Sequence, residues 1–340
     1  MGTRPALRLT VFALLLSAVS DSGAAFDWAP TDQELEKYRA SWNPHTHGAT
    51  LTVNADTVPK GRLVFRGFVF SEIGNGQFEN QLTTQSSASP FNPIVVTPRG
   101  VVLYGLADHL TVSASLSTVY WKLKDPPPPS RTGPDSGSGL GDASLMLKYR
   151  PVLQDPDSWR PTISLFSQLV LPTSKWAGTP PIPGGFEPLG HLPATRFGTL
   201  AFTEGLLVRK NLDPFRITGG VYYTYSPPGS LEGMLQYGGD LLNVRLALEH
   251  VLSEKHGFGY TVELATLHGL PYRLDGHDLN TAKRTFWVIG IQPTLEYRFL
   301  EYEGGARLVG AAGILFTVAG QNDLDAIYPN ASLKYFWAQE

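Results

Sequence analysis

The side chains of this 340-residue chain that could do chemistry are charged residues at alternate positions of long extended segments. Each lies on the opposite side of its segment from the apolar residues, because successive strand side chains point to opposite faces. The candidates for this shared polar face, which would line a lumen, are Lys148, Arg216, Arg245, Glu249, Glu263, Glu296, Arg298, Arg307 and Lys334. They can line a solute path or form internal ion pairs; we favour ion pairs, because buried charges need partners.

Pairing neighbouring segments about their turns predicts which of these charged residues lie close to one another. It places Glu296 diagonally near Arg307, and Glu263 diagonally near Arg245 and Glu249.

Other groups of residues do not match the motif of a catalytic, metal or cofactor site. The glycine-rich stretch 137–141 runs into the extended stretch 143–150, whereas a nucleotide loop needs a helix there. His45 and His47 have ligand-like spacing but no evident third ligand nearby. The chain has no Cys and no Gly-x-Ser-x-Gly turn. We therefore expect no catalytic residue, no metal and no cofactor.

Composition and the N-terminus point to export. Charged residues make up 17% of the chain, below the roughly 25% of an ordinary soluble domain. The net charge of -3 predicts no nucleic-acid partner. Residues 1–25 combine Arg4 and Arg8, a short apolar core at 11–19 and small residues at 23–25, which is typical of a cleaved signal peptide.

From residue 61 onward the hydrophobic pattern has period 2. Leu246 and Leu248, for example, alternate with Arg245, Ala247 and Glu249. About twelve such segments can be placed, at 61–72, 94–106, 110–122, 140–151, 160–172, 196–209, 215–226, 235–252, 258–269, 284–299, 305–319 and 327–337.

The links between these segments alternate between long and short. Long strands, an even strand count and two unlike sets of links are typical of a transmembrane barrel rather than a sandwich of short strands. A closed barrel also satisfies every backbone polar group within its wall, as lipid requires. The sequence therefore predicts an all-β fold, a transmembrane up-and-down antiparallel β-barrel of about 12 strands, with the short links in the periplasm.

Aromatic residues are predicted to form two belts on the lipid face. Three fall near the short-link end and three near the long-link end, as expected for rings at the two membrane interfaces. The first group is Tyr149, Tyr297 and Trp337, and the second is Tyr120, Tyr225 and Trp287.

Three short sequence motifs resemble those of a known family. Tyr104–Leu110 resembles its strand–turn–strand phrase, Gly139–Ala143 its glycine-x-glycine-aspartate strand opening, and Leu169–Thr173 its leucine-proline-threonine exit. The family is the outer-membrane β-barrel group labelled as transporters of the phenol-degradation meta pathway. The resemblance covers roughly residues 95–175 and is looser beyond. It implies an outer-membrane location and passage of aromatic or other hydrophobic compounds, and it brings no site residues.

The segment before the barrel, residues 26–60, has a different character. Thr31 and Glu34 have the spacing of a capping box that would begin a helix over Asp32–Ser41. Exposed aromatics usually pack against something, so we take Trp28 and Trp42 as candidates to wedge this segment into the lumen. A mobile periplasmic tail, or a tether to another envelope protein, is the alternative.

These observations divide the chain into a signal peptide (1–25), a periplasmic segment or lumen plug (26–60) and an outer-membrane barrel (61–340). We expect no enzyme but a passive channel for small hydrophobic or aromatic compounds. The alternatives are a lipid hydrolase or lipid-modifying barrel, and a structural or adhesin-like barrel acting through its outer loops. Expected partners are outer-membrane lipid, the barrel assembly machinery and an unidentified small-molecule substrate.

Overall fold

The structure is a computed structural model, and its described part begins after the expected signal peptide. The described residues are 29–88, 93–124, 136–177, 200–225, 229–231, 234–237, 240–269, 273–274, 277–278, 285–302 and 305–337.

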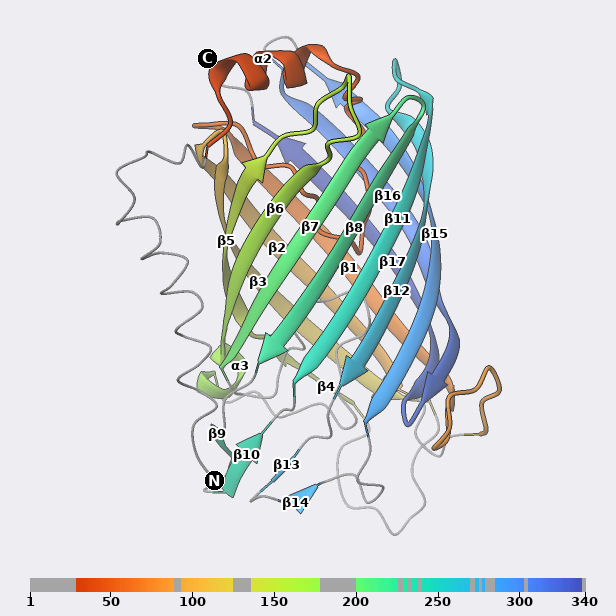
Figure 1. Cartoon of the computed structure of the whole chain (residues 1–340). Coiled ribbons are helices and arrows are strands. Elements are labelled where there is room, and N and C mark those ends of the chain that lie inside the picture. Colours follow the sequence, from red (N-terminus) through yellow and green to blue (C-terminus); the bar gives the residue numbers. More distant parts are fainter. Residues whose placement is uncertain are drawn as a thin grey trace.

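Twelve long antiparallel strands form a closed barrel, which confirms the predicted fold (Figure 1). Each strand pairs with its neighbours in the sequence, and the pairings of β1 with β17 and of β2 with β3 complete the ring. The barrel strands are β1 (Leu63–Gln77), β2 (Pro93–Ala107), β3 (Leu110–Leu123), β5 (Ala143–Val152), β6 (Thr162–Leu171), β7 (Ala201–Leu212), β8 (Phe215–Tyr225), β11 (Leu241–Ser253), β12 (Phe258–Gly269), β15 (Phe286–Glu301), β16 (Arg307–Gln321) and β17 (Leu324–Phe336).

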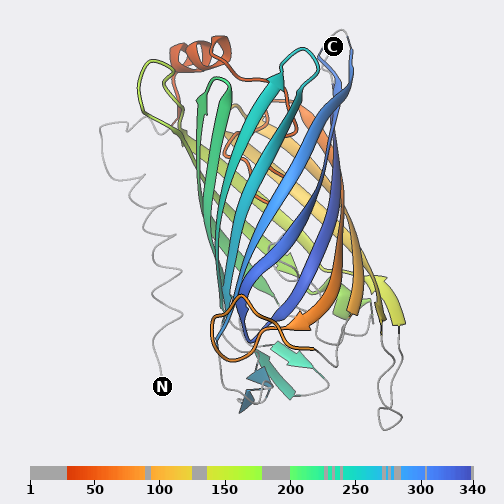
Figure 2. The same cartoon turned by 90° about the vertical axis from the view of Figure 1, so that its right-hand side faces the viewer.

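The smaller elements lie at the two ends of the barrel (Figure 2). At the end with the short turns lies helix α2 (Asp32–Ala40). The opposite end, with the long loops, carries an extension of the wall and a separate small sheet. These elements are α3 (Thr173–Trp176), β4 (Ser136–Leu140), β9 (Gly229–Leu231), β10 (Met234–Tyr237), β13 (Arg273–Leu274) and β14 (His277–Asp278).

Several of the predicted boundaries are wrong. The first segment, expected at 61–72, is β1 at Leu63–Gln77; the sixth, expected at 196–209, is β7 at Ala201–Leu212; and the eighth, expected at 235–252, is β11 at Leu241–Ser253. The predicted bounds also leave residues 320–326 as the last link, but only Asn322 and Asp323 separate β16 from β17. Asn322 adopts a positive φ of 53°, a conformation that Asn tolerates in a tight turn.

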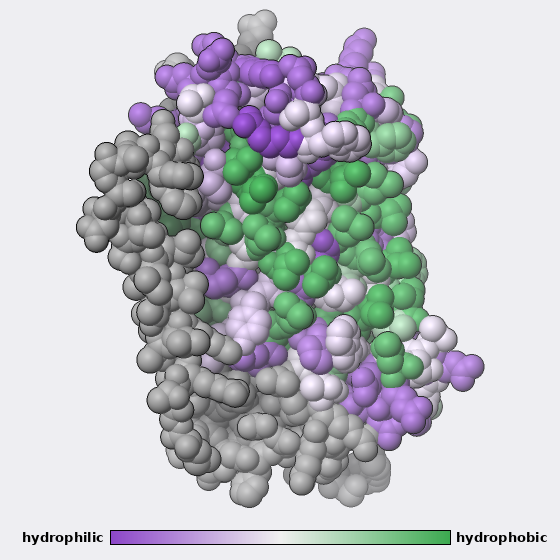
Figure 3. Space-filling model, viewed as in Figure 1, coloured by the Kyte–Doolittle hydropathy of each residue, from purple (hydrophilic) through white to green (hydrophobic). Residues whose placement is uncertain are grey.

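The alternation of the sequence becomes an alternation of environment. On β11 the side chains of Leu246 and Leu248 are 50% and 46% exposed, whereas those of Arg245 and Glu249 are 2% exposed and face the lumen. The same pattern around the ring gives an outward apolar band between two polar ends (Figure 3). None of the helices among the described residues has the length and apolar character needed to cross a membrane.

The rings expected at the two interfaces lie on the outer wall. Tyr120, Tyr297 and Trp337 are exposed, and Tyr149, Tyr225 and Trp287 are half-buried against neighbouring strands. Their contact with lipid headgroups stays a prediction.

We predict that Leu246→Arg destabilises the barrel by roughly 2–4 kcal/mol, because it places a cation near the middle of the apolar band. The neighbouring change Ala247→Ser should cost little, because Ala247 faces the lumen. Urea titration of the barrel in lipid vesicles measures both. Equal free energies of unfolding for the two variants would mean that the lipid-facing side of β11 is wrongly assigned.

Candidate functional site

Helix α2 is fixed to the short-turn end of the barrel. The capping box expected from Thr31 and Glu34 is present: the Glu34 amide donates to Thr31 Oγ1 (3.2 Å), and the Thr31 amide donates to Glu34 Oε2 (3.1 Å). Ion pairs then join the helix to the turn between β5 and β6, from Lys37 to Asp155 (2.7 Å) and from Arg160 to Glu34 (2.8 Å). The cation beside it lowers the pKa of Asp155 to about 2.

After α2 the chain enters the barrel and returns to the same end; we call residues 43–58 the lumen segment (Figure 2). At its entrance the Trp42 indole donates to Glu254 Oε1 (2.8 Å). At its exit the Gly61 amide donates to the Gly105 carbonyl (2.8 Å). Gly105 is required there, because a Cβ at this position would lie 2.1 Å from the Pro59 carbonyl oxygen.

Glu263 of β12 binds the turn of the lumen segment. Its carboxylate accepts three consecutive backbone amides, those of Thr50 (2.7 Å), Leu51 (3.2 Å) and Thr52 (2.8 Å). It also accepts the hydroxyls of Thr50 (3.1 Å) and Thr52 (2.9 Å). Hydrogen bonds to an ionised group are about twice as strong as neutral ones, so this carboxylate is the principal anchor of the segment.

Two further glutamates hold the limb of the segment that enters the barrel. Glu296 accepts the Gly48 amide (2.6 Å). Glu249 accepts the Thr46 hydroxyl and forms an ion pair with Arg216 (2.9 Å). All of these groups are buried, so each carboxylate has exchanged water for donors of the protein.

Cations of the wall bind the carbonyl groups of the same segment. The side chains come from β1, β5, β8, β11 and β17. The pairs are Arg66 with Thr50 (2.8 Å), Lys148 with Asn54 (2.9 Å), Arg216 with Pro44 (2.8 Å), Arg245 with Leu51, and Lys334 with His47 (2.6 Å). The lumen segment has neither helix nor sheet, and these side chains supply the partners that regular structure would give.

Asp56 is the one carboxylate of the lumen segment among the described residues. It forms an ion pair with Arg209, accepts the Tyr38 hydroxyl (2.7 Å), and lies 3.8 Å from Arg150 Nη1. This cluster links the returning limb of the segment both to the wall and to α2.

The sequence-predicted lumen residues therefore fall into two groups. Seven candidates from six strands converge on the lumen segment, namely Lys148, Arg216, Arg245, Glu249, Glu263, Glu296 and Lys334. Arg298 and Arg307 lie instead near the turn between β15 and β16, where Arg298 pairs with Glu301 (3.1 Å) and Arg307 lies over the Phe336 ring.

One predicted proximity is wrong. Glu296 lies opposite Ala311, and Arg307 lies opposite Glu301, so Glu296 and Arg307 are not diagonal neighbours. The main reason is that β15 continues to Glu301 and β16 begins only at Arg307, so the turn lies further along the chain than the predicted bounds placed it; a register shift between Arg298 and Leu300 adds one position. The other expected arrangement holds: Glu263 lies opposite Ala247, hence diagonal to both Arg245 and Glu249.

Sequence reasoning missed three groups of this site. Arg66 follows the period-2 pattern of β1 between Val64 and Phe68, so the alternation could have found it. Arg209 lies at the end of a segment whose bounds were misplaced, and Asp56 lies in a stretch without periodicity. Of the two wedge candidates, Trp42 lies at the entrance of the lumen segment, and Trp28 lies outside the described residues.

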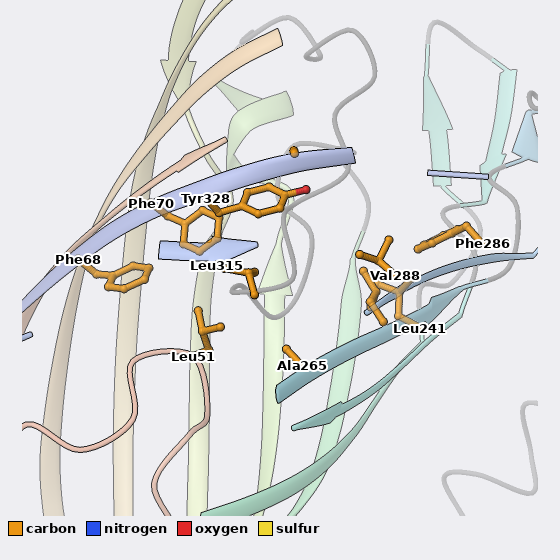
Figure 4. Close-up of a cluster of buried hydrophobic side chains, with 11 residues drawn as sticks. Leu51, Phe68, Phe70, Leu241, Ala265, Phe286, Val288, Leu315 and Tyr328 are labelled. Carbon is orange, nitrogen blue, oxygen red and sulfur yellow. The ribbon is translucent and has the colours of Figure 1, made fainter. Parts of the chain in front are cut away.

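Beyond the turn of the lumen segment the lumen becomes apolar. Leu51 at this turn packs in a buried cluster with inward side chains from both sides of the barrel, including Phe68, Phe70, Leu315 and Tyr328 (Figure 4). Across the lumen, inward residues of β2 and β3 form a second apolar cluster of Val95, Val119, Trp121 and Leu123. The half of the lumen near the long loops therefore contains mainly packed apolar side chains, with a few buried polar groups such as Glu72, Thr97 and Asn243 among them.

A cavity of about 1030 Å³ lies beside the lumen segment. Its wall is formed by inward residues of β1, β2, β3, β5 and β6, and its rim includes Arg62 and Trp337 near the short-turn end. The lumen is thus filled on the β11–β12 side and hollow on the β2–β5 side. Among the described residues, no group of three His, Asp or Glu side chains could hold a metal ion.

Comparison with known proteins supports an outer-membrane barrel. No family model matches the sequence, and no curated protein matches it. Among solved structures, the COG4313 outer membrane channel from Pseudomonas putida F1 is similar over 83% of this chain and 98% of that chain, with a TM-score of 0.63 and 12% identity. At that identity the likeness establishes a shared fold.

Other barrels are less similar. The toluene transporter TodX of Pseudomonas putida covers 85% of this chain and 95% of its own, with a TM-score of 0.35 and 11% identity. The translocator domain of the autotransporter NalP from Neisseria meningitidis covers 83% and 90%, with a TM-score of 0.42 and 14% identity.

We predict that Glu263→Gln loosens the lumen segment without opening the barrel. The amide keeps the size of the side chain but loses the charge, and a hydrogen bond to a charged group contributes roughly 1.5–3 kcal/mol. Single-channel conductance should rise, and proteolysis within residues 43–58 should become faster.

The matched control is Glu72→Gln, which changes a buried lumen glutamate of β1 that no described hydrogen bond joins to the lumen segment. If both variants conduct alike, Glu263 is not the anchor.

Proposed function

We propose that this protein is a passive outer-membrane channel for small hydrophobic compounds, as its resemblance to the phenol-degradation meta pathway transporters implies. The observation that carries the proposal is the apolar lining of the lumen half near the long loops. These clusters place aromatic and aliphatic side chains in the lumen, where a water-filled pore has polar ones.

The lining changes character along single strands. On β3 the inward residues near the short-turn end are Ser113 and Ser115, and those near the long loops are Val119, Trp121 and Leu123. Burial of apolar surface is favourable by roughly 25 cal/mol per Å², so an apolar solute would be drawn into the long-loop half. The polar half beyond it would limit how tightly the solute is held, which favours release.

The lumen segment would set the width of the path in this function. It fills the side of the lumen next to β11 and β12, and the cavity beside it is the open space from the short-turn end to the middle of the lumen. We place the short turns and α2 in the periplasm, because the exported chain begins on that side. The long loops and the apolar half of the lumen then face outside, where substrate arrives.

Deletion of residues 27–55 tests this arrangement. The shortened protein should still fold, as judged by heat-modifiable gel mobility, because the strand pairings of the barrel do not involve these residues. Its single-channel conductance should exceed that of the full chain, and vesicles containing it should admit aromatic and aliphatic solutes faster. Absence of conductance and solute entry in both forms would overturn the channel and favour a structural barrel acting through its loops.

One contact favours a second function, hydrolysis within the lumen. His47 Nε2 lies 2.9 Å from Ser332 Oγ, and His47 Nδ1 lies 2.8 Å from the Gly48 carbonyl oxygen. Burial, reinforced by Lys334 and Arg66, lowers the pKa of His47 well below its usual value. The neutral ring therefore donates from Nδ1 and accepts from Ser332, which is the arrangement of a nucleophile and its base.

The surroundings of this pair favour a structural role. Ser332 Oγ also accepts Arg66 Nε (2.9 Å), the side chain is 2% exposed, and it does not line the cavity. A fluorophosphonate probe and a chromogenic ester separate the two roles. We expect no labelling and no turnover by the purified barrel. Labelling that disappears in Ser332→Ala would establish the hydrolase.

A further inference from the structure

The charges on the walls of the cavity beside the lumen segment are strongly unequal. Arginine and lysine side chains from several strands line it, whereas its carboxylates among the described residues are Asp56, Asp108 and Glu301. Asp56 is already paired with Arg209, and Asp108 with Arg39 (3.0 Å). The glutamates that hold the lumen segment lie behind it and do not line the cavity.

Three of these cations form a row across neighbouring strands. Arg66 of β1 lies directly opposite Lys334 of β17, and Arg99 of β2 lies diagonally from Arg66, since Arg66 pairs with Val101 and Arg99 with Phe68. All three line the cavity. Like charges directly opposite each other destabilise a sheet, so the row has an electrostatic cost, and hydrogen bonds to neutral carbonyl groups do not remove it.

The lumen segment offsets little of this charge. Arg66 donates to the Thr50 carbonyl and to Ser332 Oγ, Lys334 donates to the His47 carbonyl, and Lys148 donates to carbonyls of the returning limb. These partners are neutral oxygens. Among the described residues, no carboxylate oxygen lies within 4.0 Å of a side-chain nitrogen of Arg66, Lys148 or Lys334.

The rest of the cavity wall suits the remainder of a small amphipathic molecule. Between the cationic row and Lys148 the wall presents the hydroxyls of Ser113, Ser115 and Ser144, which can donate to an anion. Val101, Leu103 and Met146 of the same wall offer apolar contact beside these donors. A volume of about 1030 Å³ lies near the upper end of the range usual for small-molecule sites.

We propose that this cavity is a binding site for a small apolar molecule that carries a carboxylate, with Arg66, Arg99 and Lys334 binding the carboxylate. The proposal rests on the proposed channel function and names the substrate class of that channel. The apolar half of the lumen takes the hydrocarbon part of such a molecule. The cationic row draws the carboxylate past the lumen segment, so the channel is selective for anions over cations.

The first test is the zero-current potential of the full chain in a planar bilayer with a gradient of potassium chloride. Its sign should show preference for chloride. When benzoate replaces chloride on one side, the zero-current potential should still show preference for the anion. When benzyltrimethylammonium replaces potassium, this cation should carry little current.

The decisive variant is Arg99→Gln, which removes one charge of the row and none of the hydrogen bonds described for the lumen segment. The permeability ratio of benzoate to potassium should fall about sevenfold, because one unit charge about 7 Å away in a water-like dielectric changes the anion and the cation about threefold each, in opposite directions. Arg99→Lys, which keeps the charge, should retain the ratio. Lys255→Gln, which removes a charge from the β11–β12 turn outside the cavity, should leave it unchanged.

Uncharged benzamide distinguishes failure of this proposal from failure of the channel. Benzoate should enter vesicles containing the barrel faster than benzamide at equal concentration. Entry of both at equal rates with a zero-current potential near zero would overturn the carboxylate site and leave the channel standing. Entry of neither compound, with no conductance, would overturn the channel itself.

Discussion

An irregular segment inside a membrane barrel can exist only if the wall supplies hydrogen bonds for its backbone. Residues 43–58 have no helix or ladder, and little water competes for their amide and carbonyl groups once they are buried. Glu263, Glu296 and the cations around them meet this demand. The charged side chains inside the barrel therefore serve first to satisfy the backbone hydrogen bonds of the lumen segment.

This arrangement separates much of the charge in space. Amides require acceptors, so the glutamates lie against the segment. Carbonyls require donors: Arg216 and Arg245 supply them beside the glutamates, whereas Arg66, Lys148 and Lys334 supply them from other strands. Because Glu263 and its neighbours are covered by the segment, the surface that remains open carries mainly the positive groups. In the proposed channel, selectivity for anions would follow from how the segment is held, and the apolar side chains of the lumen would add preference for hydrocarbon.

The sequence predicted the wall well and the contents of the lumen poorly. Period-2 alternation alone identified the facing of Glu263, because a strand in a barrel has one lipid side and one lumen side. Pairing failed between β15 and β16 because the hydrophobic alternation did not show that β15 continues to Glu301, which moves the turn; a bulge near Arg298 adds one further position. The path of residues 43–58 could not be predicted, because Thr50 and its partner Glu263 lie 213 positions apart and no periodicity links them.

The seam between the first and last strands has an additional consequence for assembly. Arg66 on β1 and Lys334 on β17 face each other across this seam, and both bind the lumen segment. Closing the wall and docking the segment therefore share residues, and by thermodynamic reciprocity each favours the other. In a partly assembled barrel with an open seam, Arg66 and Lys334, two of the five cations that bind carbonyls of the segment, are held apart. A docked segment therefore favours closure of the seam, and a closed seam favours the narrow form of the bore.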